Sequence, residues 1–241
     1  TGSYSRKLSD KLGLGVNIKY INSTLFNGTV TNSSGGTFTA QPVNSVAADI
    51  GIFHTSKTDK PWNYNWGVAI QNISGRVSYG GNESNFIPTN LKAGFAAINS
   101  IDASNKLTLT LDINKLMVPT PKYDSNGKLI QPSTAIGGIL GSFGDAPGGF
   151  GEELKEFQIS TGMEYSYNNQ FFARAGYFYE AKTKGNRRFF SVGAGVKYNK
   201  LGFNFSYLVP TGQGINRNPL SNTTRFSLLF DLGGEGSGTV E

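Results

Sequence analysis

The stretch ISTGMEYSYNNQFFARAGYFY, residues 159–179, decides the fold. One set of positions is mainly apolar or aromatic and comprises Ile159, Thr161, Met163, Tyr165, Tyr167, Ala173, Ala175, Tyr177 and Tyr179. The positions between them are mainly small or charged and comprise Ser160, Gly162, Glu164, Ser166, Arg174, Gly176 and Phe178. Such an alternation predicts two β-strands, each with an apolar and a polar face, joined by a turn at 168–169.

The same alternation recurs along the chain and predicts an all-β protein. Nine further segments carry it or extend the series: 3–8, 12–20, 46–52, 64–70, 91–95, 107–113, 190–198, 201–207 and 226–232. The sequence therefore predicts about eleven strands. Their connections alternate between short (9–10, 56–62, 100–105, 168–169, 199–200) and longer (24–44, 75–88, 117–155, 182–187, 210–221). Short turns on one rim and long loops on the other are typical of outer-membrane barrels.

Composition limits the class of protein. The 241 residues include 32 glycines, 17 phenylalanines and no cysteine, which favours many short strands joined by turns over a disulfide-stapled module. The net charge of +6 is scattered apart from the run 182–188, so we expect no nucleic-acid partner. The sequence contains no run of about 18 apolar residues, so no transmembrane helix is predicted. Membrane-spanning strands remain compatible with the sequence, because their alternation leaves the average hydropathy low.

The alternation alone does not say which face of the strands points inward, because a soluble barrel with an apolar centre shows the same alternation. The residues on each face are therefore used to predict it. The polar face carries small residues and unlike charges, as a water-filled lumen would; its candidate network is Lys92, Asp112, Glu164, Arg174, Glu180 and Arg225. Aromatic residues stand at both ends of the apolar face, and the strands are about nine to eleven residues long, enough to cross a bilayer. We therefore predict that the apolar face contacts lipid and the polar face surrounds the interior.

Domain boundaries follow from the same pattern. We expect one barrel domain over residues 1–232 and a linker or cloning scar over 233–241, where Gly, Ser and charge replace the alternation. Because single-chain bacterial barrels prefer even strand numbers, we expect that N-terminal strands are missing from the chain shown.

The sequence offers no set of residues for catalysis or cofactor binding. His54 is the single histidine and is predicted to be a plain rim residue. Without cysteine or a second histidine, soft metals have no ligand set. The pairs Gly13/Gly15 and Gly193/Gly195 lack the third glycine and the helix of a dinucleotide site. We expect no enzyme activity and no cofactor.

The stretch GSFGDAPGGFGEELKEF, residues 141–157, could be a phosphate cradle, a hinge or a partner surface. A cradle of the Walker kind would end in Gly-Lys-Ser or Gly-Lys-Thr, whereas this stretch ends in acidic residues, with one or two turns of helix expected. Its apolar residues on a solvent-facing loop favour a plug, a lid or a docking surface. The candidate partner-binding residues are Phe143, Asp145, Pro147, Phe150, Glu152 and Glu153.

Three long segments resemble one known family. The blocks SFGDAPGGFGEELKEF (142–157), ARAGYFYE (173–180) followed by KGNRR and FFSVGAGVKY, and 204–232 resemble the PorV (LptO) family of outer-membrane barrels in the type IX secretion system, which is related in fold to the FadL channels. The resemblance is most specific over 142–232 and weaker over 1–116. It implies a FadL-like barrel of about 14 strands, in the bacterial outer membrane, of which about eleven are present here.

The resemblance also implies a function. Members bind the C-terminal domain of secreted cargo at the extracellular rim, take it from the translocon barrel SprA (Sov) and deliver it to the PorU attachment complex, without catalysis of their own. Residues 141–157 would then belong to a rim loop that meets cargo or translocon. One alternative is a FadL-like channel for hydrophobic small molecules, in which Phe172, Phe178 and Phe189 would line a local apolar path. Another is a purely structural barrel.

Overall fold

The computed structural model describes residues 1–24, 28–31, 36–56, 58–80, 84–127, 129–130, 132, 134–211 and 222–231. In this part of the chain the largest element is one antiparallel sheet of 11 strands. Its strands, in sheet order and in chain order alike, are β1 (Gly2–Lys7), β2 (Leu12–Ser23), β5 (Val43–Ser56), β6 (Trp62–Ser74), β9 (Asn90–Ser100), β10 (Asn105–Leu116), β13 (Phe157–Tyr167), β14 (Phe171–Tyr179), β15 (Arg188–Tyr198), β16 (Leu201–Pro210) and β17 (Thr224–Phe230). The predicted all-β class and strand count are confirmed. Leu232, the predicted tail 233–241 and residues 212–221 lie outside the described residues.

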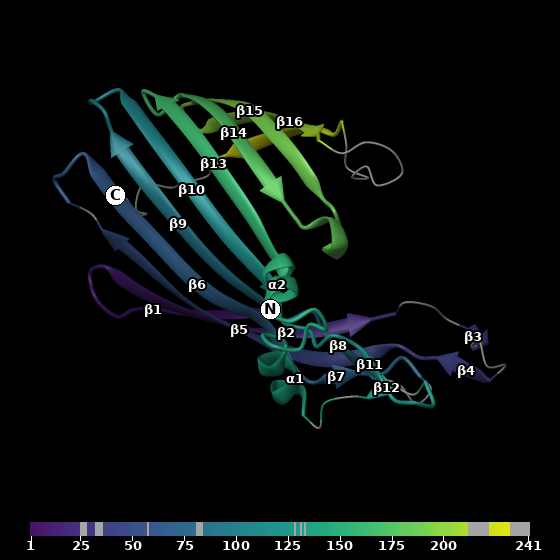
Figure 1. Ribbon diagram of the computed structural model, residues 1–241. Coiled ribbons are helices and arrows are strands. Elements are labelled where there is room, and N and C mark those ends of the chain that lie inside the picture. Colours follow the sequence, from purple (N-terminus) through teal and green to yellow (C-terminus); the bar gives the residue numbers. More distant parts are fainter. Residues whose placement is uncertain are drawn as a thin grey trace. The chain divides into compact units, whose positions relative to one another are not determined.

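The chain forms two compact units. The first comprises Thr1–Thr55, Trp66–Gly94 and Ile113–Phe157, and the second comprises Ser56–Asn65, Phe95–Asp112 and Gln158–Glu241. The hairpins from β13 to β17 belong to the second unit, where Figure 1 shows β13 to β16 running side by side. The first unit holds β1, β2 and the longest connection, residues 117–156.

The decisive stretch forms the hairpin that its alternation predicts. Tyr167 pairs with Phe171, which places Glu164 opposite Arg174 and Gly162 opposite Gly176. Asn168 and Asn169 in the turn both have φ of 51°, and Gln170 donates its N–H to the carbonyl of Tyr167. Asparagine tolerates this left-handed conformation better than other non-glycine residues, so the turn sequence fixes the register of the two strands.

The connections differ in length as predicted, and the longer ones have structure of their own. Short turns occupy 8–11, 101–104, 168–170 and 199–200, and the described residues 58–61 lie in another. The longer ones carry three two-stranded ribbons, β3 (Gly28–Thr31) with β4 (Thr37–Ala40), β7 (Arg76–Val77) with β8 (Asn85–Phe86) and β11 (Lys122–Tyr123) with β12 (Leu129–Ile130), and the helices α1 (Ala135–Gly141), α2 (Phe150–Glu153), η1 (Leu154–Glu156) and η2 (Lys182–Lys184). The acidic turns α2 and η1 match the expectation for 141–157. The ribbons and α1 are additions that the sequence did not predict.

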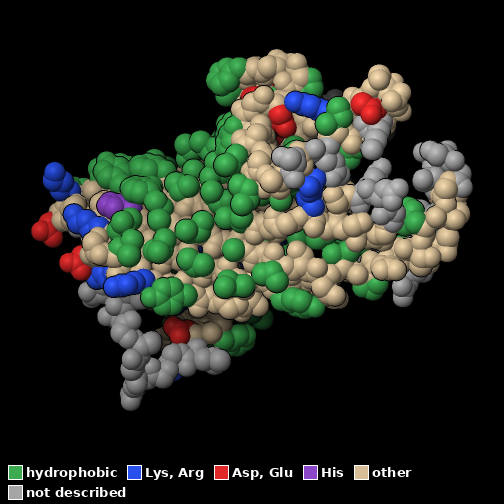
Figure 2. All heavy atoms as spheres, turned by 90° about the horizontal axis from the view of Figure 1, so that it is seen from below, with side chains coloured by type: hydrophobic (Ala, Val, Ile, Leu, Met, Phe, Trp, Pro, Cys, Tyr) green, Lys and Arg blue, Asp and Glu red, His purple; other side chains and the backbone are tan. Residues whose placement is uncertain are grey.

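Large apolar side chains along the strands are exposed. In the first unit Tyr20 is 68 % exposed and Ile50 is exposed too, whereas Asp49, on the opposite face of β5, is 5 % exposed. In the second unit Ile159, Met163, Tyr165 and Tyr167 are exposed and the residues between them, except Thr161, are less so. Soluble proteins have the reverse arrangement. Figure 2 shows hydrophobic side chains gathered over the face of the strands in view.

Buried apolar side chains are few in the described residues, and five of the eight are alanines: Ala40, Val43, Ala47, Ala97, Met117, Ile139, Ala146 and Ala181. The apolar rows of the strands therefore do not meet in a dry centre within either unit. No described helix is both long and apolar enough to pass through a membrane.

Candidate functional site

The longest connection, residues 117–156, is held against the sheet by a buried lysine. Lys115 lies near the end of β10, and its side chain is 0 % exposed. Its Nζ lies 3.2 Å from Oε2 of Glu153 and also forms an ion pair with Glu156. The same Nζ lies 5.4 Å from the ring centre of Phe143 and 5.6 Å from that of Phe157. Lys115 thus holds both ends of the segment from Phe143 to Phe157 against the strand.

Glu153, one of the predicted partner-binding residues, is buried in the loop. Its carboxylate is buried, with the residue 5 % exposed, and accepts a 2.8 Å hydrogen bond from the N–H of Ala146. Burial acts to raise the pKa of Glu153, but the hydrogen bonds from Ala146 and Lys115 outweigh it and hold the pKa below its ordinary value. A buried carboxylate that is already satisfied in this way holds the loop in place.

Two further acidic residues of the predicted set hold the loop in shape. Asp145 accepts hydrogen bonds from the N–H of Thr120 at 2.8 Å and from its hydroxyl at 3.2 Å. Glu152 accepts one from the N–H of Gly148 at 2.7 Å. Gly149 has φ of 68°, a conformation that glycine adopts without strain, and its N–H bonds the carbonyl of Ala146.

The apolar members of the predicted set are at the surface. Phe150 is 77 % exposed, and Phe143 and Pro147 are exposed as well. Sequence reasoning missed the buried Lys115, which positions the loop, and did not single out Ile136 and Leu140, which are exposed on α1. The signal for Lys115 was its parity, because a cation stands two residues after Ile113, where the alternation of β10 predicts an apolar residue.

The predicted polar network divides into pairs and single charges. Arg174 donates to Glu164 through Nε and to Oδ1 of Asn204 through Nη1 at 2.7 Å. Glu180 is 3 % exposed and pairs with Arg187, a residue that the predicted network omits. In the described residues Lys92, Asp112 and Arg225 are exposed and have no ion pair.

Another polar cluster, in the first unit, was not among the candidates. Lys19 lies 2.7 Å from Asp49 and 3.0 Å from Oδ1 of Asn72. Asp49 also accepts bonds from the side chain of Asn17 and from the N–H of Asn72, which has φ of 58°. Asn72 adopts this left-handed conformation within β6, where its bonds to Asp49 and Lys19 hold it in place.

The side chains that could ligate a metal ion are dispersed in the part of the chain that the structure describes. No group of three or more His, Asp or Glu side chains in those residues lies close enough together to hold a metal ion. His54 stacks on Trp66, with ring centres 5.4 Å apart.

The fold is that of an all-β sheet protein, and comparison with known families gives its class. The family model described as "Type IX secretion system protein PorV" matches residues 1–123, so the protein is a component of that secretion system. The chain belongs to the PorV family. The matched residues are those where the resemblance is weaker, and they end before the stretch 142–232. No curated protein matches the chain.

Proposed function

We propose that the protein is an outer-membrane β-barrel and that the 11-stranded sheet forms much of its wall. The support is the exposure of large apolar side chains such as Tyr20, Ile50 and Val192 on one face of the strands, while Glu164 and Arg174 pair on the other. A sheet in hydrocarbon has to close, because each unpaired backbone amide there costs several kcal/mol.

Tyrosines near the strand ends support the same placement. Tyr165, on the short-turn side, donates its hydroxyl to Asn105. Tyr20 donates to Asn44 at 2.7 Å and Tyr207 to Asn222 at 3.1 Å, both near the longer connections. Tyr20 and Tyr165 are exposed and Tyr207 is half-buried. Tyrosine rings that are hydrogen-bonded at the tip suit the boundary between lipid and water.

The proposed task is to carry cargo. The rim loop, residues 141–157, binds the C-terminal domain of a secreted protein, receives it from the translocon barrel SprA (Sov) and hands it to PorU, with no catalytic step. The observation that carries this proposal is Phe150, whose ring is 77 % exposed on a loop that buried ion pairs hold in one shape. A pre-shaped loop with an exposed aromatic residue loses little entropy on binding.

The test is co-purification of cargo in mild detergent, identified by mass spectrometry. Phe150→Asp should reduce captured cargo about tenfold or more, because a desolvated aromatic anchor contributes at least about 1.4 kcal/mol. The matched control is Leu8→Asp, an exposed apolar residue in a short turn at the other end of the strands. Unchanged capture by Phe150→Asp would remove the loop from the proposal.

A channel for hydrophobic small molecules is the second candidate. A pocket of about 430 Å³ in the second unit is lined by Phe172, Arg174 and Leu229, among others. Phe178 and Phe189, also predicted for a local apolar path, stack with ring centres 5.1 Å apart. Mass spectrometry of extracted lipids distinguishes the two: a stoichiometric amphiphile bound to protein without cargo favours the channel.

A further inference from the structure

The connections of the first unit enclose a cleft of about 600 Å³, distinct from the exposed surface of Phe150. Figure 1 shows that α1 and the ribbons β7–β8 and β11–β12 lie together here. All of the described residues that line the cleft belong to the connections 75–89 and 117–156, beyond the ends of the long strands. Its volume is within the range that binds drug-sized ligands or a few peptide side chains.

The floor of the cleft is apolar and closely packed. Phe86, Pro119, Leu129 and Ile130 line it, together with glycines of α1. A Cβ built on Gly138 would lie 2.7 Å from Cζ of Phe86 and 2.8 Å from Cγ of Pro119. The phenylalanine and proline therefore rest directly on the helix backbone and form a preformed apolar surface.

One wall of the cleft is a strand that, in the described residues, pairs with another strand on one side only. β8 belongs to a two-stranded sheet with β7, and its residues Asn85 and Phe86 line the cleft, whereas Arg76 and Val77 of β7 do not. In an antiparallel pair, alternate residues direct their N–H and C=O groups away from the partner strand. The edge of β8 that lies away from β7 can therefore hydrogen-bond an added strand.

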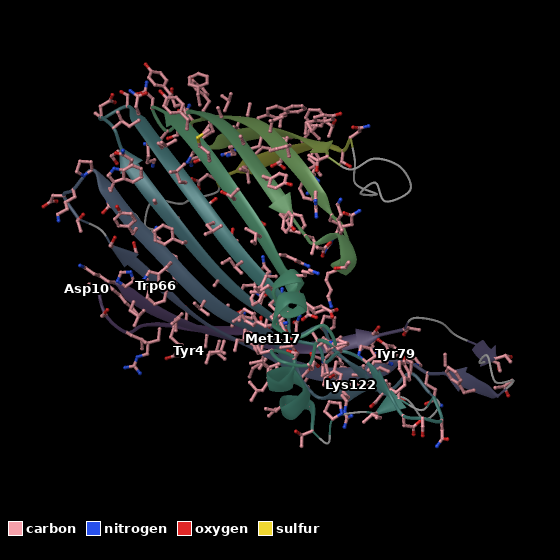
Figure 3. The ribbon with its side chains drawn as sticks, in the orientation of Figure 1. Tyr4, Asp10, Trp66, Tyr79, Met117 and Lys122 are labelled. Atoms are coloured by element: carbon pink, nitrogen blue, oxygen red, sulfur yellow. The ribbon has the colours of Figure 1, made fainter. Side chains whose placement is uncertain are left out.

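The cleft offers one exposed cation, Lys122, to a ligand. Lys122 and Asp145 are the charged residues among the described lining residues. Both oxygens of Asp145 accept hydrogen bonds from Thr120, whereas the side chain of Lys122 is exposed. Figure 3 labels Lys122 on the β11 ribbon, among the loop elements. A ligand with an acidic group beside its apolar part would complement this lining.

We propose that the cleft binds an extended segment of a protein partner, which adds as a third strand to the β7–β8 ribbon. The segment places an apolar side chain against Phe86 and Pro119 and an acidic side chain at Lys122. Strand addition supplies affinity through backbone hydrogen bonds, and the cleft supplies specificity through alternate side chains. The identity of the partner as secreted cargo rests on the proposed function.

The first test uses the full protein in mild detergent and a short fluorescent peptide of alternating valine and threonine that ends in aspartate. Fluorescence anisotropy should show saturable binding. The same peptide with N-methyl groups on alternate amides should bind at least about tenfold more weakly, because it loses the strand hydrogen bonds. Equal binding of the two peptides would overturn strand addition.

Two variants locate the site. Lys122→Glu should lower the affinity for the aspartate-ending peptide about fivefold. The same variant should bind a lysine-ending peptide more tightly than the wild-type protein does. Gly144→Phe should abolish binding by filling the cleft, since Gly144 lines it and a Cβ there meets no atom within 4 Å. The matched control is Gly151→Phe, which is equally free of clashes and lies on α2 outside the cleft lining.

The outcomes separate this inference from the proposed function. If Gly144→Phe captures cargo as wild type does and peptides do not bind the wild-type protein, the cleft inference is wrong and the cargo role stands. If wild type binds the peptide through the cleft but captures no cargo, the cleft inference stands and the cargo role is wrong.

Discussion

Arg187 forms a bidentate ion pair with the two carboxylate oxygens of Glu180. Its Nε lies 2.8 Å from Oε2 and its Nη2 lies 2.8 Å from Oε1, and the side chain of Gln158 adds a third bond at 2.9 Å. Glu180 is buried at the end of β14, so one carboxylate organises the connection between β14 and β15. Paired planar groups of this kind are geometrically specific as well as strong.

Removal of the arginine should destabilise this connection. Arg187→Ala leaves Glu180 buried with fewer donors, at a cost of about 1–3 kcal/mol in the free energy of unfolding. Urea unfolding followed by tryptophan fluorescence measures the change. Lys182→Ala is the control, because Lys182 is exposed on the same connection and has no ion pair in the described residues. Equal stability of the two variants would contradict the structural role of the pair.

Stability should fall in acid because of two buried carboxylates. The pKa of Glu180 lies below its ordinary 4.5, since the hydrogen bonds and charge of Arg187 outweigh burial, and that of Glu153 is lowered as described above. A lowered folded-state pKa contributes stability above the unfolded value, and this contribution is lost as pH falls through the folded value. Unfolding free energy should therefore decline below about pH 4.5. A double variant, Glu153→Gln with Glu180→Gln, should show a flatter decline in the same titration.

Loss of the Lys115 ion pairs should release the connection 117–156 while the sheet stays folded. Lys115→Met leaves Glu153 and Glu156 without their cation, which costs about 3–5 kcal/mol in a buried setting. We expect new proteolytic cleavage within 117–156 while circular dichroism retains the β signal. Lys155→Met, on the same connection but exposed, should leave the cleavage pattern as in wild type. Protection of 117–156 in the Lys115 variant would show that other contacts hold the loop.

Two glycines of α1 should respond oppositely to the same change. Gly138→Ala would drive a methyl group against Phe86 and Pro119, with a cost of about 1–3 kcal/mol. Gly141→Ala meets no atom within 4 Å and should be neutral or stabilising, because alanine favours helix. Thermal unfolding in detergent compares the two variants, and the packing of α1 is refuted if they unfold alike.

Adjacent residues of β15 test which face meets lipid. Val192 is exposed and Ser191, on the other face, is less so. In a bilayer Val192→Lys should cost about 2–4 kcal/mol and Ser191→Lys much less. If water surrounds the apolar face, Val192→Lys should instead be close to neutral. Unfolding in lipid vesicles decides between these outcomes.

The sequence predicted the strands well because a two-residue period depends only on local geometry. The turn at 168–169 fixes the register of its hairpin, so the opposition of Glu164 and Arg174 could be inferred once the strands were known. The partners of Lys115 could not, since Glu153 and Glu156 reach it only when a long connection folds back. α1 escaped notice because AIGGILG contains two interior glycines that disfavour helix, and contact with Phe86 and Pro119 overrides that preference.

The order of strands has a consequence for how the chain assembles. Since each long strand pairs with its neighbour in sequence, most pairings can form from nearby segments soon after these are available, which favours rapid folding. The pairing of β10 with β13 departs most from this pattern, because residues 117–156 separate the two strands in the sequence and have to loop out before they pair. The entropic cost of loop closure grows slowly, by about 0.6 kcal/mol for each doubling of loop length. This step therefore slows folding more than it lowers the stability of the folded protein.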